Sequence, residues 1–378
     1  MQFRKHRRAT GAILWALPFC AFAALSSCSS LPDNPSPAQL AELQSEVKPP
    51  RIEIDPLRGT ASTELTVMTY NVAGLPWPIK KGRRRALKEI AREVRTLHAA
   101  GRAPDVLVLQ EAFTAPALAI GEAYPNRLRG PLSSDRSNTD APQISEDFRR
   151  ARRFGKGERL GKVLSSGLYV LSDFPIAASY MTPFRRTSCA GYDCLANKGA
   201  MIAVIEIPGA PEPVQILNTH LNSNGKSGVS PERSLAAHYQ QVDEMGALMA
   251  RAVNRRWPFI YAGDFNTRHA PDRFDHNAQS LPGVFVRQHC LQPDAGCETN
   301  IAWEGDEAPW LRTQDLQGFT SGSKVSIRPV RAGMAFDKPV NGRKLSDHDA
   351  YVVTYRLAWK LEKLASANHA FRDVAAAE

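Results

Sequence analysis

Several apolar runs of this 378-residue sequence end in a side chain that could bind a metal ion or move a proton. Asparagine, glutamate, aspartate and histidine stand where a strand would ordinarily give way to turn residues. The residues are Asn71, Glu111, Asn218, His220, Asp264, Asn266, Asp347 and His348. Burying such a group without a hydrogen-bond partner costs about 1–3 kcal/mol, so their recurrence at strand ends predicts one shared cleft.

The chemistry of this set follows from its atoms: it combines oxygen donors with two imidazoles and contains no cysteine. Carboxylate and amide oxygens favour Mg²⁺, with Mn²⁺ or Ca²⁺ as alternatives, over zinc. A hard dication beside a histidine suits phosphoryl transfer, because the metal neutralises phosphate oxygens while the imidazole removes a proton from water. The sequence has no glycine-rich phosphate loop, dinucleotide fingerprint or GxSxG elbow, which argues against nucleotide-powered, redox and serine-hydrolase chemistry.

Short strands that alternate with helices are expected to position these residues. Helical spacing of apolar residues predicts a helix at 84–100, and a second helix from Pro231, capped by Ser230, to about residue 255. The alternation indicates an α/β fold, and a composition of 43% hydrophobic and 23% charged residues excludes collagen-like, coiled-coil and wholly disordered chains. Apolar runs predict strands at 65–70, 106–109, 167–171, 200–207, 214–218, 259–262 and 350–355.

The stretch 126–162 departs from this pattern. It is rich in Arg, Ser, Asp and Gly and includes the run RRARRFGKGERLGK. A structureless stretch of this length inside a domain is usually functional or disordered, so we expect a mobile surface loop.

The motifs TYNVAGLP, LQEAF, SGLYVLSDFPI, NTHLNS, AGDFNT and LSDHD occur in this order. Together they resemble the endonuclease/exonuclease/phosphatase superfamily, which includes DNase I, over about residues 64–357. The resemblance implies a four-layer α/β sandwich, with two packed mixed sheets and helices outside. It also implies metal-dependent hydrolysis of phosphoesters.

The resemblance also implies roles for individual residues. Glu111 matches the acidic metal ligand with Asn71 beside it, and Asp347 matches a further carboxylate on the metal side. His348 matches the general base that activates water. His220 matches the histidine that stabilises charge on the pentavalent phosphate.

Four further positions complete the expected site. The family pattern implies that Asp264 and Asn266 align the nucleophile and hold the phosphate or a metal. A separate aspartate should orient His348, because neighbours in an extended chain point to opposite faces and Asp347 is badly placed for that role. Asp315 is the best positional match, with Asp337 as the fallback. Asn218 and Lys198 are assigned to phosphate or substrate binding.

Three sequence features are most similar to the neutral sphingomyelinase branch of the superfamily. NVAGLP, SGLYVLSDFPI and the Lys198-Gly199 pair carry this likeness, which implies phospholipase C-like hydrolysis of a headgroup phosphodiester. A secreted or periplasmic nuclease is the alternative, because the basic runs 80–95 and 149–162 could contact a nucleic-acid backbone. An inositol-phosphate phosphatase is a third hypothesis. A non-catalytic adhesin with this fold would show gaps among the catalytic residues, and the sequence shows none.

The first residues have the features of an export signal. A basic start, an apolar run and the sequence Leu-Ser-Ser-Cys ending at Cys28 are typical of a bacterial lipobox, with a plain signal peptide as the alternative. We therefore expect a lipid-anchored monomer of the cell envelope, attached to the membrane through its N-terminal lipid. Cleavage removes four of the ten net positive charges, leaving 10 − 4 = +6. The expected divisions are a signal peptide at 1–28, a tether at 29–62, the catalytic domain at 63–357 and a polar tail at 358–378.

Export also changes how the remaining cysteines are interpreted. An even number in an oxidising compartment favours disulfides, and the short spacings favour Cys189 with Cys194 and Cys290 with Cys297, although four cysteines allow three pairings. A zinc site is the alternative, but no histidine has ligand spacing beside either pair. Trp77, Trp303 and Trp310 could serve as interfacial anchors or as core residues.

Overall fold

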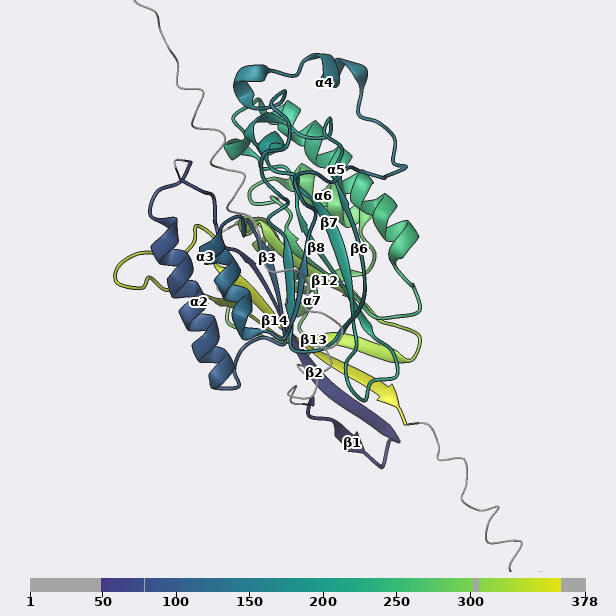
Figure 1. Cartoon of the computed structure of the whole chain (residues 1–378). Helices are drawn as coiled ribbons and strands as arrows, with labels where there is room; N and C mark the ends of the chain where they lie inside the picture. The colour runs from purple at the N-terminus through teal and green to yellow at the C-terminus, as the bar shows by residue number, and fades with distance from the viewer. Residues whose placement is uncertain (1–48, 78, 302–305, 362–378) are drawn as a thin grey trace, which may run out of the picture.

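The computed structural model describes residues 49–77, 79–301 and 306–361, and its strands form two sheets packed face to face (Figure 1). The eight-stranded sheet has the order β11-β13-β14-β2-β3-β5-β4, with β1 paired to β2, and the six-stranded sheet has the order β10-β12-β9-β8-β7-β6. Both are mixed, since β2 runs parallel to β3 and β8 runs parallel to β9 among antiparallel neighbours. The predicted four-layer α/β sandwich is confirmed.

The strand bounds are as follows. The larger sheet contains β1 (Glu53–Asp55), β2 (Thr60–Asn71), β3 (Val106–Gln110), β4 (Asn126–Arg129), β5 (Tyr169–Ser172), β11 (Glu298–Thr299), β13 (Val325–Ala335) and β14 (Ala350–Lys360). The smaller sheet contains β6 (Ile176–Pro183), β7 (Gly199–Ile205), β8 (Val214–His220), β9 (Phe259–Asp264), β10 (Val284–Phe285) and β12 (Asp315–Thr320).

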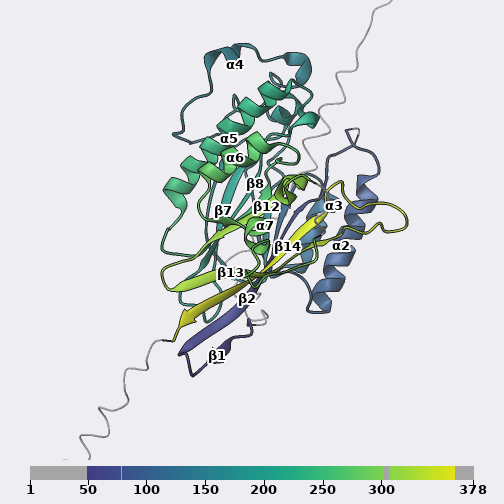
Figure 2. The ribbon, with the colours of Figure 1, turned by 180° about the vertical axis from the view of Figure 1, so that it is seen from behind.

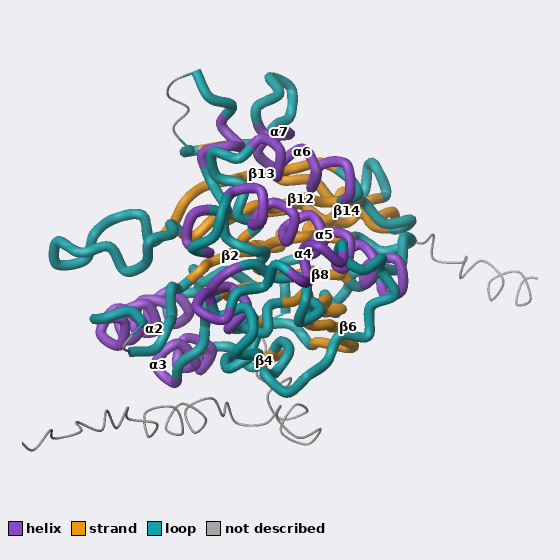
Figure 3. The backbone as a smooth tube through the Cα atoms, turned by 90° about the horizontal axis from the view of Figure 1, so that it is seen from above, coloured by secondary structure: helices purple, strands orange, loops and turns teal. Residues whose placement is uncertain are grey.

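Alternation along the strands divides the core into layers. In β2, Leu65 and Val67 face the other sheet, whereas Met68 and Tyr70 pack beneath helix α2. Because side chains of a strand alternate between its two faces, one strand supplies both the core between the sheets and the core under a helix. Figure 3 shows the strands in the middle of the molecule with helices outside them.

Helices cover the outer face of each sheet (Figures 1 and 2). Helix α2 (Arg83–Ala99) and the short α3 (Ala115–Leu118) pack on the larger sheet, and α5 (Pro231–Ala252) and α6 (Pro271–Ser280) cover the smaller one. Ser230 caps α5 as predicted, since its Oγ accepts a hydrogen bond from the Arg233 amide at 3.4 Å. Shorter helices occur at α4 (Glu146–Arg150) and α7 (Val286–Cys290). None of the described helices is both long enough and apolar enough to cross a bilayer.

Several boundaries in the structure differ from those predicted from the sequence. The folded part starts before the predicted boundary at 63, because β1 and the first residues of β2 pair with each other, and it extends past 357, because β14 continues to Lys360. The stretch 126–162 is not structureless: it begins with β4 at the edge of the larger sheet, and Ile144 and Phe148 pack against Ala190 and Ala237. The signal segment, Cys28 and Trp303 lie outside the described residues.

Candidate active site

Three predicted residues form a row across the smaller sheet. Asp264, the last residue of β9, pairs in register with His220 at the end of β8 and with Asp315 at the start of β12. Residues in register on adjacent strands project from the same face, so these three side chains point together toward the larger sheet. All three are buried.

The larger sheet brings its own residues to the same place. Asn71 ends β2, and Glu111 follows β3 in a left-handed conformation with φ 55°. The Asn71 side-chain amide donates to Asp264 Oδ2 at 2.9 Å and to Glu111 Oε1 at 3.3 Å. One amide therefore connects carboxylates from both sheets, and the site lies where the two sheets meet.

His348 completes this cluster from the segment before β14. Its Nδ1 lies 2.7 Å from Asp315 Oδ2, and its Nε2 lies 3.7 Å from Asp264 Oδ2. Burial alone would lower the pKa of His348, but the carboxylates of Asp315 and Asp264 outweigh burial and raise it to about 9. The structure thus brings Asp315 to His348 as expected, whereas the fallback Asp337 is exposed.

The carboxyl group of Asp264 is buried beside a second carboxyl group, that of Asp315. Burial raises the pKa of this carboxyl to about 7; His348 opposes the shift and the neighbouring Asp315 adds to it. Oδ1 of Asp315 is buried and has no hydrogen-bond partner among the described residues. Ligand atoms of Asp264, Asp315 and His348 lie within 4.8 Å of one another, close enough to hold a cation. The carboxylate oxygens of this cluster are donors that a hard divalent ion prefers, and Asp264 also faces the Glu111 carboxylate across the Asn71 amide.

Asn266 is held beside Asp264 by the loop after β9. Its backbone amide donates to Asp264 Oδ1 at 3.0 Å, and its side-chain amide donates to the Leu221 carbonyl at 3.0 Å. Its φ is 53°, a left-handed conformation in which asparagine is enriched. The predicted pair Asp264 and Asn266 is therefore brought together, with the amide connected to the segment that follows His220.

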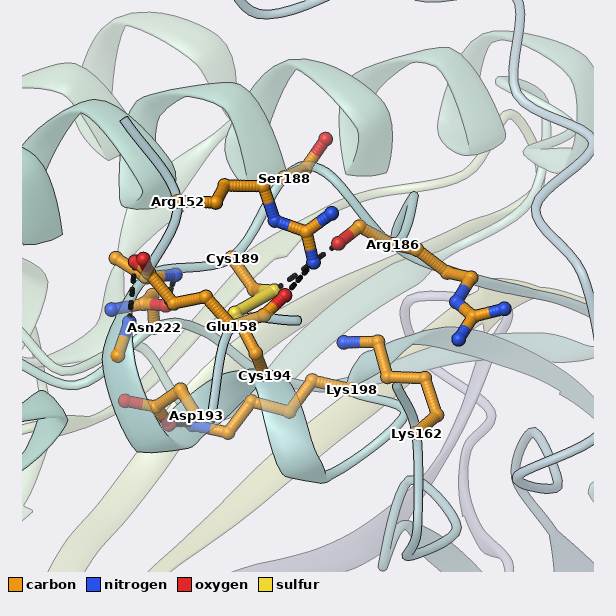
Figure 4. The surroundings of a disulfide bond; sticks show 12 residues. Arg152, Glu158, Lys162, Arg186, Ser188, Cys189, Asp193, Cys194, Lys198 and Asn222 are labelled. Carbon is orange, nitrogen blue, oxygen red and sulfur yellow. Dashed lines mark hydrogen bonds and ion pairs between the residues drawn. A yellow bond between two sulfur atoms is a disulfide. The ribbon is translucent and has the colours of Figure 1, made fainter. Parts of the chain in front are cut away.

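The buried ion pair of Lys198 and Asp193 lies next to His220. Lys198 Nζ lies 3.0 Å from His220 Nε2, donates to the Leu221 carbonyl at 2.9 Å and pairs with Asp193. Asp193 lies in the loop closed by the Cys189–Cys194 disulfide (Figure 4). Burial, together with the positive charge of Lys198, lowers the pKa of His220 well below its ordinary value. Lys198 thus reaches the site, but its ammonium group already contacts His220, the Leu221 carbonyl and Asp193.

Two predicted site residues have other roles in the structure. Asn218 lies two positions before His220 on the same face of β8, one step deeper between the sheets. Its amide donates to the carbonyls of Leu109 and Tyr169 at 3.0 and 2.9 Å, and its oxygen accepts from Gln110. Asn218 therefore connects the two sheets, and its assignment to substrate binding stays a prediction.

Asp347 is the second of these residues. Its Oδ2 lies 3.1 Å from Lys80 Nζ and 2.6 Å from Lys226 Nζ at the half-exposed rim of the site. Burial would raise its pKa, but the hydrogen bond and charge of Lys226, with Lys80, lower it far below its ordinary value. Two ammonium groups already neutralise this carboxylate, so its role on the metal side stays a prediction.

Sequence reasoning missed the two arginines that hold the catalytic loops. Arg83 donates to the carbonyls of Val72 and Ala73, which follow Asn71, and to the carbonyl of Leu345, three residues before His348. The distances are 2.8 Å to Val72, 2.7 Å to Ala73 and 2.6 Å to Leu345. One guanidinium therefore fixes the loop after β2 against the loop before β14.

Arg273 of α6 does the same for the other two loops. Its fully buried guanidinium donates to the carbonyls of Asn222 and Ser223, after His220, and to the carbonyl of Asn266. Both arginines bind main-chain oxygens of distant segments, so no side-chain motif in the sequence could have identified them. Gln314 was also missed; its amide lies against the His348 ring.

The cysteines and tryptophans can also be placed. Both predicted disulfides are present, Cys189–Cys194 and Cys290–Cys297. Trp310 packs against Phe274 in the core under α6, whereas Trp77 is exposed near the site.

Comparisons with known proteins agree with this geometry. A model of the Endonuclease/Exonuclease/phosphatase family matches residues 68–318. A curated sphingomyelinase of Mycobacterium bovis is 25% identical over 306 residues, which are 78% of this chain and 53% of that protein. The chain thus spans about half the length of the curated relatives it matches.

Two solved structures share the fold. Sphingomyelinase C of Streptomyces griseocarneus is 20% identical with a TM-score of 0.52, covering 77% of this chain and 99% of that one. A mutant beta toxin of Staphylococcus aureus with bound magnesium ions is 16% identical with a TM-score of 0.54, covering 79% of this chain and 100% of that one.

Proposed function

We propose that this chain, which belongs to the endonuclease/exonuclease/phosphatase family, is a divalent-metal-dependent hydrolase of phosphodiester bonds. The observation that carries the proposal is the buried pair of His348 and Asp315, with Nδ1 and Oδ2 2.7 Å apart beside the Asp264 carboxylate. An imidazole oriented by a carboxylate at one ring nitrogen can take a proton at the other.

In the proposed reaction, His348 Nε2 removes a proton from the water that attacks phosphorus, and Asp315 holds the ring and stabilises the imidazolium that forms. Gln314 lies against the ring and is only half-buried, so its side chain can give way to the attacking water. Asp264 and Asn266 align the water and the phosphate. His220, kept neutral by burial and by Lys198, faces the developing negative charge from the adjacent strand.

The residues present fit a divalent cation. The carboxylates of Glu111 and Asp264 both accept from the side-chain amide nitrogen of Asn71, which lies between them, and such carboxylate oxygens suit Mg²⁺. Bound there, the cation would supply positive charge to the phosphate oxygens and the leaving group. A magnesium-bearing beta toxin with the same fold supports Mg²⁺ as the first cation to test.

A phospholipid headgroup ester is the proposed substrate. Support comes from the sphingomyelinases among the curated relatives and from the motifs that resemble that branch. The reaction would be phospholipase C-like, releasing the phosphorylated headgroup. A nuclease remains the competing outcome because the segment 149–162 is strongly basic.

The proposed location is the cell envelope, with the chain attached through a lipid on Cys28 and acting as a monomer. The lipobox-like sequence before Cys28 supports this proposal. Replacing Cys28 with serine should move the protein from the membrane to the soluble fraction. Unchanged fractionation would contradict the anchor.

The experiment that tests the function is a side-by-side assay of the chain from residue 29 onward, which retains every described residue. Sphingomyelin vesicles, phosphatidylcholine vesicles, plasmid DNA, inositol phosphates and bis-p-nitrophenyl phosphate would each be incubated with Mg²⁺ or with EDTA. We expect Mg²⁺-dependent release of phosphocholine from sphingomyelin and slow hydrolysis of the bis-ester. Faster cleavage of DNA would favour the nuclease, and activity that survives chelation would contradict the metal dependence.

A further inference from the structure

The segment 149–163, called here the basic segment, exposes apolar side chains among positive charges. Phe154 is 66% exposed, Leu160 46% and Val163 45%. Seven arginines and lysines lie in this segment with a single acid, Glu158. Exposed apolar side chains cost free energy in water, so a cluster of them on one segment indicates a surface that is covered in use.

The basic segment is held rigidly. The carboxylate of Glu158, fully buried, accepts hydrogen bonds from the Arg153 amide, the Gly191 amide and the Arg233 guanidinium, at 2.6, 3.0 and 2.7 Å. The Val163 amide donates to the Leu195 carbonyl at 2.8 Å. The only acid of the segment is thus turned inward, as are Arg152 and Lys162, which donate to main-chain carbonyls. Phe154 and Leu160 stay on the outside with Arg153 and Arg159.

The basic segment lies next to the active site. Lys156 Nζ is 5.7 Å from the centre of the Tyr192 ring, which is 49% exposed and lies against Gly228. Two residues before Gly228, Lys226 pairs with Asp347 at the rim. A continuous series of contacts therefore connects the segment to the residue that precedes His348.

A second exposed apolar group lies on the other side of the rim. Trp77 is 73% exposed and Ile79 58%, in the loop after β2, and Lys80 of the same loop also pairs with Asp347. Figure 1 shows this loop and α4, which precedes the basic segment, at the same end of the sandwich. Apolar and basic side chains thus flank the mouth of the site from both sides.

We propose that the basic segment, with Trp77 and Ile79 opposite it, is a docking surface for an anionic phospholipid bilayer. Its charge complements acidic headgroups, and its exposed aliphatic side chains suit the headgroup–acyl boundary. A nucleic acid fits less well: the rings of Phe154 and Trp77 suit either partner, but the exposed aliphatic side chains of Leu160, Val163 and Ile79 suit only the bilayer. The proposal rests on the proposed function for its purpose, since docking here would present headgroups to His348, but bilayer binding itself needs no hydrolysis.

The test measures sedimentation of the chain from residue 29 onward with vesicles of phosphatidylcholine alone or with about a third phosphatidylglycerol. One variant, Phe154→Ser with Leu160→Ser, removes apolar contacts, and a second, Arg153→Glu with Arg159→Glu, reverses charge. Matched controls place the same pairs of changes at other exposed positions, Ile54→Ser with Leu57→Ser and Arg255→Glu with Arg256→Glu. Hydrolysis of soluble bis-p-nitrophenyl phosphate reports folding, because none of these residues contacts the catalytic cluster.

We expect the unmodified chain to bind the anionic vesicles at least about tenfold more tightly than the neutral ones. Each basic-segment variant should lose about tenfold in anionic-vesicle binding with unchanged hydrolysis of the soluble ester, and each control should change less than twofold. Equal binding by variants and controls would overturn the docking surface. So would loss of binding to a single-stranded oligonucleotide with vesicle binding intact. If vesicle binding follows this pattern but no ester is hydrolysed, the proposed function fails and the docking surface stands.

Discussion

The inner cluster of the site, formed by Asp264, Asp315 and His348, and its rim, formed by Asp347 with Lys80 and Lys226, both pair acids with bases. The inner cluster is buried, and its two carboxylates outnumber its one imidazole. The rim is partly exposed, and its two ammonium groups outnumber its one carboxylate. Asp347 and His348 are adjacent in sequence yet belong to different regions.

This difference in burial and charge predicts which of the two regions carries out the reaction. Exposed ion pairs contribute about 0–1 kcal/mol because water competes for both partners. In the inner cluster, burial raises the pKa of Asp264, and the two carboxylates outweigh burial and raise the pKa of His348, so the cluster attracts a cation or a proton. We therefore expect large effects on catalysis from the inner cluster and small ones from the rim.

The largest expected effect is that of His348→Gln. Loss of the general base should lower kcat at least about a hundredfold, the low end for this role. The assay is hydrolysis of bis-p-nitrophenyl phosphate at saturating Mg²⁺, with thermal unfolding as the check on folding. A nearly normal rate in a folded variant would remove His348 from the mechanism.

Asp315→Asn should have the next largest effect, at least about a tenfold loss of kcat, because the amide no longer stabilises the imidazolium. In the metal-free variant, the pKa of His348 should fall from about 9 toward 6.5, since the leading charge that raises it is gone. Nuclear magnetic resonance of the ring protons measures this titration. An unchanged pKa would show that Asp315 does not control His348.

The free energy of unfolding should also depend on the charge of His348. In EDTA, the folded-state pKa of His348 near 9 lies above its ordinary value of 6.5. Its contribution to the free energy of unfolding is therefore fully present below pH 6.5 and is lost as the pH rises through about 9. Denaturant titrations of the wild type and His348→Gln should converge over this range. A stability difference that grows with pH would contradict the assignment.

A moderate effect is expected from Arg83→Ala, because Arg83 joins the loops that carry Asn71 and His348. We predict a several-fold fall in kcat with little change in KM, partly restored by added guanidinium. Arg84→Ala, at the neighbouring exposed position, is the matched control and should retain normal kinetics. Failure of rescue together with a lowered melting temperature would reduce Arg83 to a structural role.

The smallest effect is expected from Asp347→Asn. Removing the rim carboxylate frees Lys80 and Lys226 but leaves the inner cluster intact, so kcat should stay within about threefold of the wild type. The remaining effect should decrease as salt is added, because exposed charges are screened. A loss as large as that of His348→Gln would return Asp347 to the metal side and abolish the distinction between the regions.

Two members of the inner cluster lie at strand ends, since Asp264 ends β9 and Asp315 begins β12, whereas His348 was identified from the LSDHD motif. Register then placed His220, Asp264 and Asp315 in one row, as the period of two along a strand requires. Asn218 shares a face with His220, but its side chain forms hydrogen bonds between the sheets. Asp347, like His348, precedes β14 in a loop whose direction no strand pattern sets, so its position at the rim could not be predicted from the sequence.

Other parts of the fold could not be predicted from local pattern. The short edge strand β4 has little apolar alternation, so its residues resembled a loop. Arg83 stands within a run of basic residues, and only the tertiary structure distinguishes it from its exposed neighbours. The inward turn of Glu158 likewise depends on Arg233, 75 positions away in the chain.

A double-mutant cycle on Asp315 and His348 tests the central claim most directly, because the account makes these two residues one catalytic unit. Rates would be measured at saturating Mg²⁺ for Asp315→Asn, His348→Gln and the double variant. Since Asp315 acts through His348, the double variant should be as slow as His348→Gln alone, within about twofold. Losses that multiply would show that the two residues act independently and would contradict the account.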